Sequence, residues 1–94
     1  MPTSNRLPEE ARADIVARLK RIEGQAKGIQ KMIADDRDCL EILDQTASIK
    51  AATNALTGQV LEAFALYCLH HPDEFASPEE AVAQTVRALV RAGR

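Results

Sequence analysis

The chain has 94 residues, a formal net charge of −2, and a composition that is 46% hydrophobic but only 3% aromatic. This length fits one domain, residues 1–94, whose small core would gain stability from self-association. Because no apolar run reaches the roughly 18 residues of a membrane span and the polar N-terminus lacks the apolar stretch of a secretory signal, we expect a cytoplasmic protein with no membrane partner.

Hydrophobic periodicity and helix-breaking residues predict an all-α chain with three helices, at about residues 8–35, 39–71 and 78–92. The first helix opens near Pro8 with proline and acids, which suit a first turn. Asp38 is a suitable N-cap for the second helix. Before the third helix, Ser77 supplies an N-cap, Pro78 takes the first helical position, and Glu80 is placed to close a capping box.

The two longer predicted helices form a hairpin with a large apolar face. The second of them would be roughly 45 Å long, and its apolar seam is too long for the short third helix to cover. One hairpin cannot close a core, whereas two can do so as an antiparallel four-helix bundle. We therefore expect at least a homodimer.

Charge is distributed unevenly along the chain. Residues 12–31 contain six basic and two acidic side chains, a local balance of +4, whereas residues 35–44 contain five acidic side chains and one arginine. A basic stretch of this kind is a feature of nucleic-acid-binding proteins that the total charge conceals. It is also compatible with a solvated helix face. No nucleophile–base pair or phosphate-binding loop is found, so we do not expect an enzyme.

Two cysteines mark the ends of the second predicted helix. Cys39 and Cys68 are 29 residues apart, or about 43 Å along one helix, whereas a disulfide needs Cα atoms within about 7 Å. Two antiparallel copies of the helix would bring Cys39 of one subunit to Cys68 of the other. The helix N-terminus favours a thiolate at Cys39 although the preceding acids oppose it, and we expect Cys68 to be more buried. Alternatively, each cysteine is a small buried hydrophobe.

The run RLKRIEGQ at 18–25, followed by Cys39, Gln45 and the run ASIKAA at 47–52, resembles the copper-sensitive operon repressor (CsoR) family. The similarity covers about residues 10–91. It implies an all-α fold in which antiparallel four-helix-bundle dimers pair into a homotetramer. It also implies a repressor that binds operator double-stranded DNA without a helix-turn-helix and is released by an inducer.

The same resemblance implies two sets of site residues. The DNA-binding candidates are polar side chains of the first two helices, namely Arg12, Arg18, Lys20, Arg21, Gln25 and Lys50. They would engage phosphates and read DNA shape, with limited contact to base edges. The inducer-sensing thiols are Cys39 and Cys68, with Phe64 and Leu61 packing beside them.

Copper sensors of this family carry a histidine four residues before the second cysteine, where this chain has Phe64. The chain therefore resembles the persulfide-sensing branch most, in which a per- or polysulfide links the two thiols of neighbouring subunits. This interpretation predicts a sulfane-sulfur inducer and no cofactor. The alternative is a Cu(I)-responsive repressor that uses the same two thiolates. Two further alternatives are a formaldehyde-responsive repressor, suggested by Pro2, and a helical dimerisation module with no role in DNA binding.

Overall fold

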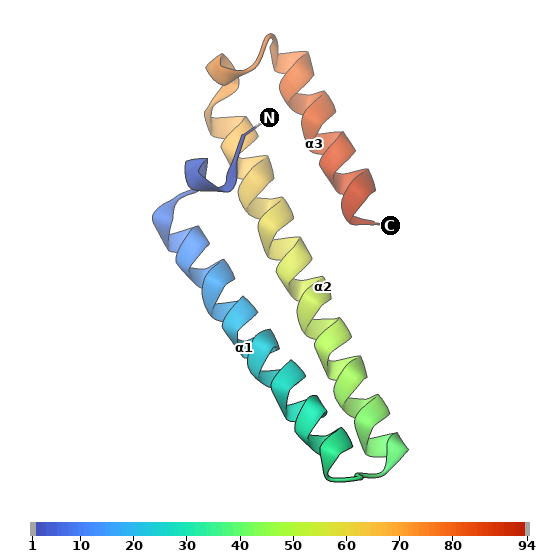
Figure 1. Ribbon diagram of the computed structural model, residues 1–94. Helices are drawn as coiled ribbons and strands as arrows, with labels where there is room; N and C mark the ends of the chain where they lie inside the picture. Colours follow the sequence, from blue (N-terminus) through green and yellow to red (C-terminus); the bar gives the residue numbers. More distant parts are fainter. Residues whose placement is uncertain (1, 94) are drawn as a thin grey trace.

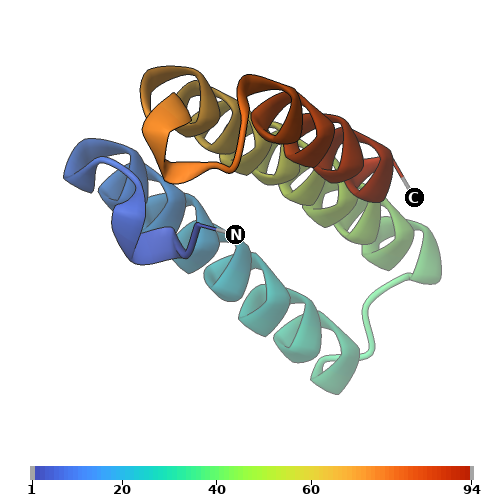
Figure 2. The same cartoon turned by 90° about the horizontal axis from the view of Figure 1, so that it is seen from above.

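The computed structural model describes residues 2–93. It contains three α-helices and two short 3₁₀ helices, in the order η1 (Ser4–Arg6), α1 (Glu9–Ala34), α2 (Cys39–His70), η2 (Pro72–Glu74) and α3 (Pro78–Ala92). Figure 1 shows α1 and α2 side by side as an antiparallel hairpin, with α3 folded back along the C-terminal half of α2. The same arrangement is seen from above in Figure 2. The predicted all-α fold of three helices is confirmed, and the described residues contain no strand.

The turn between α1 and α2 is built by acidic residues. Asp36 adopts a positive φ of 55°, a left-handed conformation that aspartate tolerates better than most residues. Asp38 then caps α2, because its side chain accepts a hydrogen bond of 3.3 Å from the Leu40 amide. The second helix therefore begins at Cys39, as its capping residue indicated.

The start of α3 follows the predicted pattern in part. The Ser77 hydroxyl accepts a hydrogen bond of 3.1 Å from the Glu80 amide, and Pro78 is the first helical residue. The Glu80 carboxylate does not return to the cap. It accepts a hydrogen bond from Gln84 and forms an ion pair of 3.3 Å with Arg87. Only half of the expected capping box is therefore present.

A single chain buries little of its apolar surface. The buried apolar residues are Ala63, Tyr67, Cys68 and Ala81, all near the junction of α2 with α3. Large apolar side chains are exposed along all three helices, for example Leu69 at 70% and Leu40 at 68%. The chain is also long and flat, with extents of 56 × 26 × 14 Å. Apolar exposure on this scale is typical of a surface that meets another protein.

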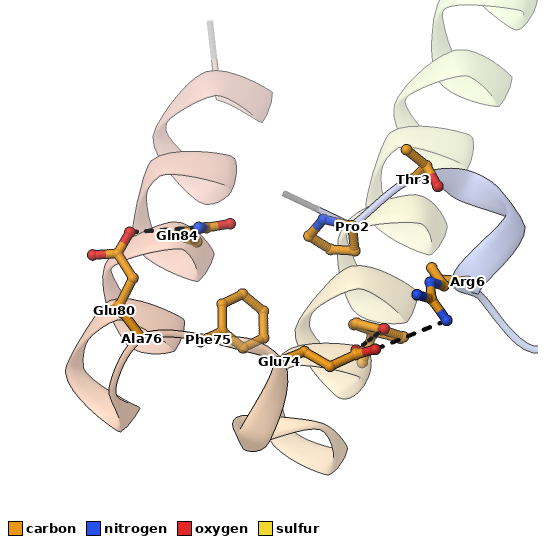
Figure 3. Close-up of a pocket in the computed structure, with 9 residues that line it drawn as sticks. Pro2, Thr3, Arg6, Glu74, Phe75, Ala76, Glu80 and Gln84 are labelled. Atoms are coloured by element: carbon orange, nitrogen blue, oxygen red, sulfur yellow. Dashed lines mark hydrogen bonds and ion pairs between the residues drawn. The ribbon is translucent and has the colours of Figure 1, made fainter.

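The N-terminal segment lies beside the α2–α3 junction, an arrangement that we did not anticipate (Figure 3). Arg6 of η1 forms an ion pair of 3.9 Å with Glu74 of η2. The Tyr67 hydroxyl donates a hydrogen bond to the same carboxylate. Tyr67 also stacks on His71, with ring centroids 4.3 Å apart. These contacts tie both 3₁₀ helices to the end of α2.

None of the helices between residues 2 and 93 is both long enough and apolar enough to cross a bilayer.

Candidate functional site: two distant thiols and a basic helix

Cys39 is the first residue of α2, and its side chain is exposed. It holds this position because the Asp38 cap starts the helix there. An ion pair of 2.6 Å joins Arg37 to Glu41 across the same turn, so the nearest arginine already has an acidic partner. The thiol is accessible to a reagent or a second chain from solvent.

Cys68 lies near the other end of α2 and is only 4% exposed. It follows Leu61 and Phe64 by seven and four residues, so the three side chains share one side of the helix. Leu61 and Phe64 line a groove whose other wall is α3, so Cys68 is on the α3-facing side of α2. The expectation that Cys68 is the more buried thiol is confirmed. A second sulfur can reach it only if the packing at this junction opens.

The two thiols of one chain are far apart. α2 is continuous from Cys39 to His70, and 29 residues at 1.5 Å each separate the two cysteines by about 43 Å. A disulfide needs Cα atoms within about 7 Å, and a shared metal ion needs a similar approach. Cys39 and Cys68 of the same chain can therefore neither bond to each other nor share a ligand.

Among the residues that the structure describes, no three or more His, Cys, Asp or Glu side chains gather closely enough to hold a metal ion. Because the continuous α2 helix keeps the two thiols of one chain about 43 Å apart, a site that uses both Cys39 and Cys68 requires a second chain.

The basic residues of α1 fall into two groups. Arg18, Arg21 and Gln25 follow one another at steps of three and four residues, so they share one side of the helix. Gln25 is half-buried at the hairpin interface, where its amide donates a hydrogen bond of 3.2 Å to the Ser48 hydroxyl of α2. The position of Gln25 in this contact indicates that it helps to join the two helices.

Arg12 and Lys20 belong to a separate group. They line a shallow hollow together with Val16, on a different side of α1 from Arg18. Lys50 lies on α2 two residues beyond Ser48, which is a rotation of about 200°, so it projects away from α1. One chain therefore does not bring all six predicted DNA-binding residues onto a single face.

The five basic residues of this set are exposed. Within residues 2–93, the ion pairs are Arg6–Glu74, Lys27–Glu23, Arg37–Glu41 and Arg87–Glu80. None of these pairs involves a predicted DNA-binding residue. The charges on Arg18 and the other members of the set are thus available to an anionic partner.

One cluster beside Cys68 was missed by the sequence reasoning. The Tyr67 hydroxyl donates a hydrogen bond to Glu74, and Glu74 in turn pairs with Arg6. The sequence signal for this cluster was weak: Glu74 follows Tyr67 by seven residues. That spacing predicts no contact by itself, because the two side chains meet only after the chain turns at Pro72. The cluster links the N-terminal segment to the immediate neighbour of the buried thiol.

Comparison with known proteins gives a consistent picture. The model of a family described as metal-sensitive transcriptional repressors matches residues 11–91. The copper-sensing transcriptional repressor CsoR of Bacillus subtilis is 35% identical over 82 residues, which cover 87% of this chain and 81% of that protein. The copper-sensing repressor RicR of Mycobacterium tuberculosis is 33% identical over 52 residues, covering 55% of this chain and 54% of RicR.

Solved structures resemble the chain in fold as well. The copper-sensing repressor CsoR with Cu(I) from Geobacillus thermodenitrificans superposes with a TM-score of 0.78 and 33% identity, covering 100% of this chain and 94% of that one. The nickel-responsive regulator InrS gives a TM-score of 0.75 and 29% identity, covering 85% of this chain and 90% of its own.

These comparisons correct one prediction. The expectation of no cofactor, with Cu(I) only as the alternative, is wrong, because the matched family is metal-sensitive and its relatives respond to copper or nickel. The physical reason is that Phe64 removes only one possible ligand. Two cysteine thiolates remain, and thiolates are the soft ligands that Cu(I) selects.

Proposed function

The chain belongs to the metal-sensitive transcriptional repressor family, and we propose that it binds operator DNA until an effector joins Cys39 of one subunit to Cys68 of the partner subunit. The observation that carries this proposal is the placement of one exposed and one buried thiol about 43 Å apart on a single continuous helix. An effector that acts on both thiols must therefore act between chains. The family consists of transcriptional repressors rather than enzymes.

Assembly is the first requirement of this proposal. The exposed apolar side chains of the hairpin support a dimer of two chains, built as an antiparallel four-helix bundle. Two such dimers would then pair into a tetramer. An antiparallel pair of α2 helices places the start of one beside the end of the other. Each dimer would then contain two sites, and each site would use one Cys39 and one Cys68.

Sulfane sulfur is the effector that we propose for this pair. The exposed Cys39 thiolate attacks the outer sulfur of a per- or polysulfide, the sulfur–sulfur bond of the donor breaks, and a thiolate or hydrosulfide leaves. Cys39 is then a persulfide. Cys68 of the partner subunit attacks the inner sulfur of that persulfide, expels hydrosulfide and forms a disulfide. The donor supplies the oxidising equivalents, and sulfur retained from a longer polysulfide would lengthen the bridge.

The effect on DNA follows from the burial of Cys68. Because this thiol is 4% exposed in the junction with α3, a bridge to a second chain must open the local packing. We propose that the bridged dimer adopts a subunit arrangement that fits the operator less well, which is a coupling between two distinct sites. Arg18, Arg21 and Lys50 from several subunits would supply the phosphate contacts in the reduced state.

Cu(I) is the metal effector that we propose for the same pair of thiols, alongside sulfane sulfur. It is supported by the copper-sensing relatives and by the two soft thiolates. Phe64 stands where the copper-sensing pattern has a histidine, so Cu(I) would have two protein ligands from this pair. The two thiolates would supply the sulfur ligands and the negative charge that balances the ion, and they would hold it between the subunits.

The test measures operator binding by the reduced protein. Binding is detected as a change in the fluorescence anisotropy of a labelled DNA fragment that carries the promoter of the protein's own gene. Polysulfide, Cu(I) and formaldehyde are added in separate titrations. Release by polysulfide, with loss of the response in Cys39→Ser and Cys68→Ser, supports the first proposal, and release by Cu(I) alone supports the second. Release by formaldehyde alone contradicts both. Failure of the reduced protein to bind the promoter would favour a helical dimerisation module instead.

A further inference from the structure

Three segments from distant parts of the chain meet at the end of α2. Arg6 of η1 forms an ion pair of 3.9 Å with Glu74 of η2, and Glu74 also accepts the hydrogen bond from the Tyr67 hydroxyl (Figure 3). Cys68 follows Tyr67 directly, in the last turn of α2, which ends at His70. We propose that Arg6, Glu74 and Tyr67 are positioning residues that form a clasp, which holds this turn in place and limits how often Cys68 can be reached. The role of the clasp in sensing rests on the function proposed above, because Cys68 is the thiol that the bridge must reach.

Tyr67 is the part of the clasp that lies on α2. Its side chain is only 6% exposed, and its ring stacks on His71 with centroids 4.3 Å apart. The Tyr67 carbonyl accepts a hydrogen bond of 3.0 Å from the His71 amide, the last one that closes the helix. The final turn of a helix has no further turn to order it. A displacement of the Tyr67 ring would therefore shift the backbone of the turn that contains Cys68.

The contacts of Glu74 decide how tightly the clasp closes. The Arg6 side chain is 62% exposed and that of Glu74 is 33% exposed, so water and salt screen this ion pair and its contribution is modest. The hydrogen bond from Tyr67 is part-buried and has a carboxylate acceptor, which makes it the stronger of the two contacts. Such a clasp can open locally while the three helices stay folded.

Access to Cys68 requires a local opening of this kind. The thiol is 4% exposed and lies on the α3-facing side of α2, whereas Cys39 at the other end of the helix is exposed. Persulfide formation at Cys39 therefore does not depend on the clasp. The second step does, because the Cys39 persulfide of one subunit meets Cys68 of the other only while the last turn is open. The clasp would thus set the rate of bridge closure.

Labelling with N-ethylmaleimide tests the clasp in the Cys39→Ser protein, whose single thiol is Cys68. The reagent is uncharged, so a change of charge at the clasp does not alter its local concentration. Arg6→Ala and Glu74→Gln should each raise the labelling rate roughly two- to fivefold, because each removes the ion pair. Their combination should have no larger effect than either change alone, because both break the same pair. Arg6→Lys should restore a nearly unaltered rate, and unchanged labelling in Arg6→Ala would overturn the proposal.

Salt provides a second measurement that needs no change at the clasp. At 1 M salt the screening length is about 3 Å, which is shorter than the 3.9 Å of the Arg6–Glu74 pair. Labelling should then approach the rate of Arg6→Ala, whose own rate should hardly change. Lys27→Ala is the matched control, because Lys27 and Glu23 form an exposed ion pair of 3.6 Å within α1; it should label at the unaltered rate and respond to salt in the unaltered way. An equal salt response in Arg6→Ala would contradict the clasp.

Two other routes to Cys68 would also contradict the proposal. If the thiol is reached only by global unfolding, its labelling rate will rise with urea as steeply as the unfolding equilibrium does, instead of staying nearly flat at low urea. If the partner subunit alone controls access, the rate will depend on protein concentration and will be the same in Arg6→Ala. None of these measurements uses DNA or an effector, so their failure would leave the proposed repressor function untouched. Conversely, failure of polysulfide to bridge the subunits would leave the labelling results intact.

Discussion

Mixing two single-cysteine variants gives a direct test of the thiol pairing. Cys39→Ser retains only Cys68, and Cys68→Ser retains only Cys39. Neither variant alone can form a bond between the two positions. A mixed dimer contains one complete pair, because the Cys68 of one chain meets the Cys39 of the other.

The size of the effect follows from the structure. The continuous α2 helix keeps the two sulfur positions of one chain about 43 Å apart, roughly six times the largest Cα separation that a disulfide permits. The wild-type protein should therefore form only links between chains after polysulfide treatment. After complete subunit exchange, roughly half of the dimers should contain one chain of each variant. About half of the dimers can then be cross-linked, each with one bridge.

Non-reducing electrophoresis and intact-mass measurement read the result. The expected products are cross-linked dimers in the wild-type protein and in the mixture, with none in either variant alone. Mass measurement gives the number of sulfur atoms in the bridge. A bridge within one wild-type chain, or cross-linked dimers of Cys68→Ser alone, would refute the antiparallel pairing.

Three further changes test the proposed sites. Arg18→Ala should weaken operator binding and reduce the slope of log affinity against log salt concentration by about 1, as measured by anisotropy at several salt concentrations. An unchanged slope would rule out a phosphate contact. Arg37→Ala is the control, because Arg37 is paired with Glu41. Phe64→His restores the third copper-ligand position and should tighten Cu(I) binding, as measured by competition with a chelator; unaltered Cu(I) affinity would contradict the placement of this residue beside the thiol pair. Ser77→Ala removes the hydrogen bond to the Glu80 amide and should lower stability by about 1 kcal/mol, seen as a shift in the denaturation midpoint with no change in polysulfide cross-linking.

Local signals explain why much of the fold could be predicted. Asp38 and Ser77 cap helices through contacts with residues two or three positions away, so their effect can be read directly from neighbouring letters. The separation of Cys39 and Cys68 follows from helix rise alone. The position of Phe64 relative to Cys68 is also a matter of spacing. The proposed requirement for a second chain therefore rests mainly on sequence.

Other features depend on how separate helices meet. Tyr67 and Glu74 interact only because the chain turns between them, and Arg6 joins them from the far end of the sequence. Helical periodicity already divides the basic residues between different sides of α1 and α2. Which of these sides remains open to DNA depends on how the two helices pack against each other. The α2–α3 groove exists only because α3 folds back at a particular distance from α2.

The sequence by itself determined three helices, one thiol at each end of the longest helix and a basic first helix, because capping, periodicity and helix rise act over a few residues. Only the tertiary structure decided that Cys68 lies on the α3-facing side of α2, that the N-terminal segment reaches Glu74, and that two arginines border an apolar groove. Those features depend on the packing of segments far apart in the chain, which no local pattern specifies.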